Sequence, residues 1–155
     1  MNSVIFYLAS DPLDWESAGK NYLDLVQSLA LLGVDEAEAE RLGLTTYKVG
    51  QVWPLDMASF HDWAEGLDLI IVVEEKRKLV EVQIKEAIFN DRQGRRVIGW
   101  KDEAGNTVFT VKMALNPVLV ASKLAGLLAA EGVETDALRT ARQEVDAALH
   151  EDNAP

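Results

Sequence analysis

The chain alternates short apolar runs with amphipathic segments, and this alternation indicates an α/β domain in which helices pack on a sheet. Apolar, β-prone runs at residues 4–8 and 44–49 each predict a strand. The clearest predicted strand is residues 69–73, Leu-Ile-Ile-Val-Val, because a continuously apolar run is typical of a parallel strand covered on both faces. The pattern therefore favours a mostly parallel sheet.

Apolar residues also recur at helical spacing, which predicts helices between and after these strands. Most of the predicted helices have a boundary signal: glycines follow four of them, and four start at a side chain suited to an N-cap, namely Asp35, Asp56, Asn116 and Thr135. The last one has a narrow apolar stripe and a charged remaining face, so we expect it to lie on the surface, with a frayed tail behind it. The predicted helices cover residues 20–32, 35–42, 56–65, 79–89, 116–131 and 135–150.

A β-hairpin is expected over residues 97–111. Residues 97–100 and 107–111 are β-prone, and they flank Asp-Glu-Ala-Gly-Asn at 102–106, a composition typical of a turn.

Composition narrows the classes of function. The 155 residues carry 15 Lys and Arg against 26 Asp and Glu, a net charge of −11, which disfavours nucleic acid and anionic membranes as partners. The lack of cysteine excludes thiolate metal sites, iron–sulfur ligation and a cysteine nucleophile within this chain. No apolar run reaches the roughly 18 residues of a membrane helix, and the first residues lack a signal-peptide pattern, so we expect a cytoplasmic protein.

The first candidate site is the segment at residues 47–55, which follows a predicted strand. Gly50 permits a tight turn, and Trp53 with Pro54 offers a flat surface of low conformational entropy. The alternative is that Trp53 only covers the edge of the core beneath the helix that starts at Asp56. Composition alone favours this alternative.

The second candidate site is the charged run Glu74, Glu75, Lys76 and Arg77, which follows the buried strand at 69–73. Ligands of open α/β sheets bind beyond the carboxyl ends of the strands, so polar groups at this place are functional candidates. The alternative is a salt-linked loop that caps the next helix, and it is favoured locally because charge runs usually form solvated surface. No glycine-rich phosphate loop and no nucleophile elbow accompanies either site.

Several motifs taken together resemble indolepyruvate:ferredoxin oxidoreductase. They lie at residues 19–24 (GKNYLD), 42–44 (LGL), 47–50 (YKVG), 53–56 (WPLD), 72–77 (VVEEKR), 83–86 (QIKE) and 115–117 (LNP). The order strand, Pro-Leu-Asp, helix and Val-Val-Glu-Glu is more distantly similar to the C-terminal domain of transketolase-like thiamine enzymes, which implies a three-layer α/β/α sandwich.

This resemblance divides the chain into an atypical strand and loop at 1–17, the transketolase C-like domain at 18–132, and a C-terminal helix and tail at 133–155. Where the family has a strand running into the Gly-Lys turn, this chain has the poor strand sequence 13–17 and an earlier strand-like run at 4–8. We expect either an insertion between strand and helix or a shifted start with an improvised first strand.

The resemblance implies a parent enzyme that oxidatively decarboxylates aryl pyruvates to acyl-CoA. Such an enzyme uses thiamine diphosphate, Mg²⁺ and iron–sulfur clusters, and ferredoxin accepts the electrons. The family's thiamine-binding and cluster-binding motifs are absent from this chain. The implied role is therefore that of a structural and assembly domain, or a fragment, of such an enzyme. We expect it to bind none of these cofactors and not to turn over substrate alone.

The implied partners are the other domains or subunits of that oxidoreductase. The expected interdomain contact residues are Lys48, Gly50, Trp53, Pro54, Glu74, Glu75, Lys76 and Arg77. The alternative function is a free-standing small-molecule or regulatory binding domain, which a pocket at the carboxyl ends of the strands would favour. A self-contained enzyme that uses Glu74 and Glu75 is the least favoured hypothesis.

Overall fold

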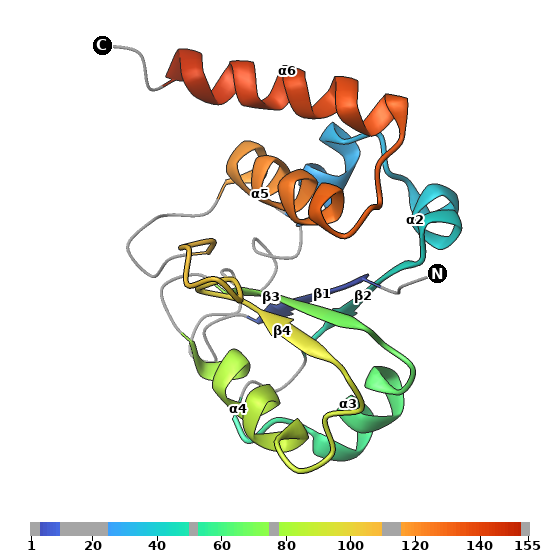
Figure 1. The fold of residues 1–155 in the computed structure, drawn as a ribbon, viewed down its shortest axis with the longest axis vertical. Helices are drawn as coiled ribbons and strands as arrows, with labels where there is room; N and C mark the ends of the chain where they lie inside the picture. Colours follow the sequence, from blue (N-terminus) through green and yellow to red (C-terminus); the bar gives the residue numbers. More distant parts are fainter. Residues whose placement is uncertain (1–3, 10–24, 50–52, 75–77, 110–115, 153–155) are drawn as a thin grey trace.

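A computed structural model of the chain describes residues 4–9, 25–49, 53–74, 78–109 and 116–152. Within this part, four parallel strands form one sheet in the order β2-β1-β3-β4 (Figure 1). The strands are β1 (Val4–Ala9), β2 (Leu44–Lys48), β3 (Leu69–Glu74) and β4 (Arg96–Ile98). The predicted strands and their parallel pairing are confirmed, and the early run at residues 4–8 lies between β2 and β3 in the sheet.

Residues 25–31 are helical, and the predicted helices that follow are confirmed. They are α2 (Glu36–Leu42), α3 (Met57–Ala64), α4 (Leu79–Ile88), α5 (Pro117–Ala130) and α6 (Asp136–Asp152). The predicted N-caps accept backbone N–H groups in the first turns, which otherwise lack partners. These bonds run from Glu38 to Asp35 (2.8 Å), Ser59 to Asp56 (3.2 Å), Leu119 to Asn116 (2.9 Å) and Leu138 to Thr135 (3.1 Å).

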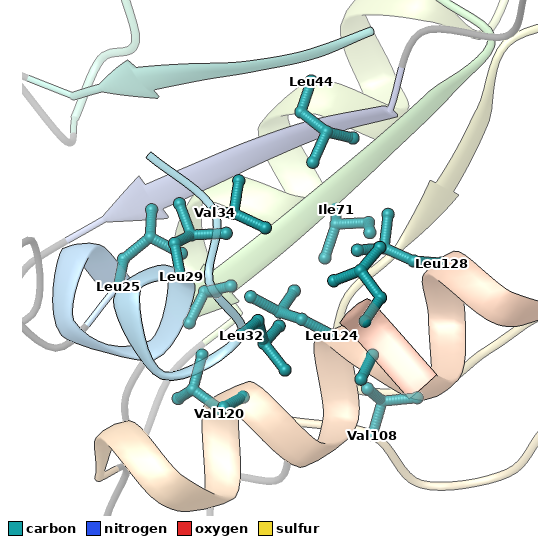
Figure 2. Packing of buried hydrophobic residues seen from close by; sticks show 14 of the residues in the cluster. Leu25, Leu29, Leu32, Val34, Leu44, Ile71, Val108, Val120, Leu124 and Leu128 are labelled. Atoms are coloured by element: carbon teal, nitrogen blue, oxygen red, sulfur yellow. The ribbon is translucent and has the colours of Figure 1, made fainter. Parts of the chain in front are cut away.

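Both faces of the sheet are covered by helices, which explains why the β3 sequence is apolar throughout. Leu69, Ile71 and Val73 pack in one hydrophobic cluster with the helix at residues 25–31 and with α5. Ile70 and Val72 pack on the opposite face in a second cluster with α3 and α4. Figure 1 shows α3 and α4 on one side of the sheet and α5 on the other, with α6 beyond it. Figure 2 shows side chains of both flanking helices and of β3 meeting in the first cluster.

The hairpin expected at residues 97–111 is confirmed as an antiparallel reversal, although only residues 96–98 of it form a regular strand. β4 pairs in parallel with β3, and the chain then folds back on itself. An antiparallel bridge joins Lys101 to Thr107, and the N–H groups of Val108 and Phe109 donate to the carbonyls of Trp100 (2.8 Å) and Gly99 (3.2 Å). Val108 and Phe109 follow that bridge and are buried in the first cluster. Residues 96–98 thus pair with β3, and residues 99–101 pair with residues 107–109. Residues 110–111 lie outside the described part.

The C-terminal helix α6 lies on the surface, as its pattern predicts. It packs on α5, with Leu138 and Val145 as its buried hydrophobic residues. The Ser122 hydroxyl of α5 donates a hydrogen bond of 2.6 Å to the Asp146 carboxylate of α6. Among the helices of the described residues, none combines the length and apolar character needed to cross a membrane.

Candidate functional site

The strands β1, β2 and β3 end close together, and we call this place the carboxyl end of the sheet. The register pairs Leu8 with Lys48 and Ala9 with Glu74, so the last residues of the strands lie side by side. Parallel strands bring their carboxyl ends to one edge of a sheet, and these three strands do so here. The predicted contact residues Gly50, Glu75, Lys76 and Arg77 lie outside the described residues.

Trp53 and Pro54 are exposed beside the carboxyl end of the sheet, with 64% of Trp53 accessible to solvent. The interpretation that Trp53 covers the edge of the core is therefore wrong, because Leu55 fills that place in the second cluster. The Leu55 N–H donates a hydrogen bond of 2.8 Å to the Gln83 side-chain oxygen in α4. Gln83 is buried, and its amide donates to the Leu79 carbonyl at 3.0 Å, so the exposed tryptophan adjoins a firmly attached segment.

Glu74, the last residue of β3, is buried and turns its carboxylate onto the start of α4. One oxygen accepts the Val80 N–H at 2.7 Å and the other accepts the Glu81 N–H at 3.0 Å. The interpretation that the charged run caps the next helix is confirmed for this residue. Burial raises the pKa of Glu74 to about 7, against the lowering effect of these two bonds, and the nearby Glu81 carboxylate adds to the increase.

Glu81 is a second buried carboxylate, and sequence reasoning missed it. It accepts the Trp100 N–H at 2.6 Å and forms an ion pair of 2.9 Å with Lys85, one helical turn further on. Its carboxylate lies so close to Gly99 that a Cβ atom there would be 1.8 Å from the glutamate oxygen. The turn after β4 is thereby fastened to α4; nothing in the local sequence distinguishes Glu81 from an exposed glutamate of the same helix.

Arg95 is the other residue whose place the sequence did not reveal, because it stands in a run of polar turn residues. Its side chain is buried, at 2% exposure. The guanidinium donates to three backbone carbonyls, those of Asp91 (2.6 Å), Arg92 (2.9 Å) and Ala64 (3.2 Å). Ala64 is the last residue of α3, so Arg95 joins the end of that helix to the turn before β4 at the end of the sheet opposite Glu74.

The chain was compared with known protein families, curated proteins and solved structures. The family model of the indolepyruvate oxidoreductase domain matches residues 13–152. The chain belongs to this family. The match starts before residue 18 and includes α6, so it is longer than the stretch on which the sequence resemblance rests. No curated protein and no solved structure gives a significant match.

The chemistry of this indolepyruvate oxidoreductase domain at the carboxyl end of the sheet is dominated by hydrogen bonds to the backbone. The carboxylates of Glu74 and Glu81 each accept backbone N–H groups, and Lys78 lies with its amine 4.4 Å from the centre of the Trp100 ring. Across the described ranges, no group of three or more Asp, Glu or His side chains is placed to hold a metal ion. At the carboxyl end of the sheet, the exposed Trp53 therefore adjoins a segment that buried hydrogen bonds attach to α4.

Proposed function

We propose that this domain supports the assembly of an indolepyruvate:ferredoxin oxidoreductase, docking on a neighbouring domain or subunit through the carboxyl end of its sheet. The observation that carries the proposal is the exposure of Trp53 beside a segment tied to α4 by the buried Gln83. Tryptophan is enriched among the residues that contribute most to binding at protein interfaces. Because the segment beside Trp53 is already held in place, less conformational entropy is lost on docking. Pro54 adjoins Trp53 and is also exposed, so it extends this surface.

The fold proposed for the domain is the three-layer α/β/α sandwich of the transketolase C-terminal type. Its support is the pair of separate hydrophobic clusters, one on each face of the parallel sheet. The engagement of Glu74 and Glu81 with backbone N–H groups supports a positioning role for these carboxylates. The parent enzyme would decarboxylate aryl pyruvates with thiamine diphosphate, Mg²⁺ and iron–sulfur clusters held by its other parts, and would pass electrons to ferredoxin.

The alternative of a free-standing binding domain calls for a pocket at the carboxyl ends of the strands. The groove formed by described residues includes Leu44, Thr45 and Thr46, so it lies beside the first half of β2. This groove is a different surface from the carboxyl end of the sheet, so the binding domain stays the second hypothesis for the chain.

The test is purification of the tagged chain from its native source, followed by identification of the polypeptides that come with it. We expect a partner that carries the thiamine-binding and cluster-binding motifs, and a preparation that reduces a viologen dye when supplied with indolepyruvate, CoA, thiamine diphosphate and Mg²⁺. Trp53→Ala should lower the recovered partner about tenfold, as loss of an interface hot spot does.

Phe89→Ala is the matched control, because Phe89 is an aromatic residue with 81% exposure at the far end of α4. It should leave both the partner and the dye reduction unchanged. Equal recovery with the Trp53 and Phe89 variants would contradict docking through the carboxyl end of the sheet. Dye reduction by the purified chain alone would contradict the supporting role itself.

A further inference from the structure

β2 is one of the two outer strands of the sheet, and among the described residues its outer backbone edge has no partner strand. β1 pairs with it on one side, and within the described residues no strand pairs on the other. The N–H and C=O groups along an unpaired edge form a ready template for another strand, which is how many domains bind extended peptides. Thr45 and Thr46, in the middle of β2, are both exposed, so the strand is open to solvent on both of its faces there.

A groove of about 970 Å³ lies against this strand, and we call it the β2 groove. Its walls come from the helix at residues 25–31 and from α2, and its floor comes from β2. Val26, which is 45% exposed, Leu29, Val34 and Ala39 give the walls an apolar surface. The size is that of a site able to accept several side chains.

The rim of the β2 groove is acidic. Asp35, Glu36 and Glu40 line it, and no basic residue is among the lining side chains. The Asp35 carboxylate caps α2, and the neighbouring Arg41 is held by Glu38 at 2.6 Å. Glu36 and Glu40 are exposed one turn apart on α2, and neither forms an ion pair with a described residue. Their charges are thus available to an incoming cation.

These charges argue against a second copy of the chain as the occupant. Two copies that paired their β2 strands would bring the acidic rims of both grooves together, in a protein whose net charge is already −11. Like charges within a Debye length of about 8 Å repel each other at physiological salt. A partner segment with lysine or arginine side chains carries the opposite charge, so the acidic rim attracts it.

We infer that the β2 groove receives an extended, basic and apolar polypeptide segment from another part of the oxidoreductase, which adds to the sheet beside β2. Its backbone would bond to the outer edge of β2, its apolar side chains would enter the groove, and its cations would pair with Glu36 and Glu40. That the segment comes from the same oxidoreductase rests on the proposed function. That it is extended, basic and apolar is inferred from the residues of the β2 groove.

The experiment compares hydrogen exchange in the isolated chain and in the assembly purified through it. We expect those β2 amides that do not bond to β1 to exchange at least about tenfold more slowly in the assembly. A carbodiimide, which joins carboxylates to lysine amines in direct contact, should link Glu36 or Glu40 to a lysine of the partner. Links between two copies of this chain at these residues would overturn the inference in favour of self-association.

Charge reversal supplies the second arm. The double variant Glu36→Lys with Glu40→Lys should weaken the assembly about tenfold and reduce its sensitivity to salt, because it removes charges from the rim of an interface. Glu86→Lys, at an exposed position of α4, is the matched control and should change neither. The assembly could form and depend on Trp53 while the β2 amides exchange as fast as in the isolated chain. That result would overturn this inference and leave the proposed function standing. Failure of any assembly to form overturns both.

Discussion

The buried carboxylate of Glu74 makes a sharp prediction about how stability depends on pH. Two effects oppose each other at this group: burial disfavours the charged form, whereas the two N–H bonds from the start of α4 favour it. Burial is the larger effect and raises the pKa from the ordinary 4.5 to about 7. The perturbation is Glu74→Gln, which keeps the shape of the side chain and removes the titration.

The sign follows from proton binding. The folded chain holds the Glu74 proton up to about pH 7, whereas the unfolded chain releases it near 4.5, so the folded state binds more protons between these values. The free energy of unfolding therefore falls as pH rises through this window. The contribution is fully present below about pH 4.5 and is lost above 7. Integrated between about pH 5 and pH 8, it amounts to about 2.5 kcal/mol at 1.36 kcal/mol per pKa unit.

Urea denaturation at a series of pH values from about 5 to 8 measures the effect. We expect the difference in unfolding free energy between the wild type and Glu74→Gln to decrease by about 2.5 kcal/mol across this range. Loss of one acceptor in the variant adds an offset of about 1 kcal/mol that does not vary with pH.

Glu86→Gln is the matched control, since Glu86 is exposed on the same helix. Its difference from the wild type should stay constant with pH. If the Glu74→Gln difference stays constant or increases with pH, the helix N–H bonds outweigh burial, and the reasoning about this site is refuted. A side-chain carbon NMR titration of Glu74 would then place its pKa at or below the ordinary value.

Two further substitutions test contacts that hold the ends of the sheet. Arg95→Met removes a buried guanidinium that serves three carbonyls and should lower the free energy of unfolding by about 3 kcal/mol, whereas the exposed Arg139→Ala should cost less than about 1 kcal/mol. Gly99→Ala forces the Glu81 carboxylate away and should cost about 1–3 kcal/mol by urea denaturation. In a double-mutant cycle this cost should shrink in the Glu81→Ala background; unchanged cost would contradict the steric explanation.

Features that depend on neighbours in sequence were predictable. Asp35, Asp56, Asn116 and Thr135 cap helices as predicted, because a cap needs only a side-chain oxygen within three residues of a free N–H group. The apolar run at residues 69–73 indicated a strand covered on both faces, and β3 is such a strand. The motifs that resemble indolepyruvate:ferredoxin oxidoreductase also indicated the family that the family model matches.

At the candidate site, the sequence placed Glu74 at the end of a buried strand and offered capping as one role, and the structure has both. Composition favoured Trp53 at the edge of the core, whereas the resemblance made it a contact residue. Leu55, two residues later, is equally able to fill the core, and the structure buries Leu55 and leaves Trp53 exposed. Glu81 and Arg95 were missed for a related reason. Burial of a charged side chain requires partners, and for each of these two residues one partner lies far away in sequence. The Trp100 N–H is 19 residues from Glu81, and the Ala64 carbonyl is 31 residues from Arg95.

The sequence by itself therefore determined the order of helices and strands and the family, since periodicity, caps and motifs are properties of short stretches of chain. Only the tertiary structure decided that β1 lies between β2 and β3, and that residues 96–98 pair with β3 before the chain reverses. It also decided that β2 has no partner strand on its outer side among the described residues. These outcomes depend on competition between distant segments for the same backbone partners and the same core. The result of that competition cannot be predicted from any short stretch of the sequence.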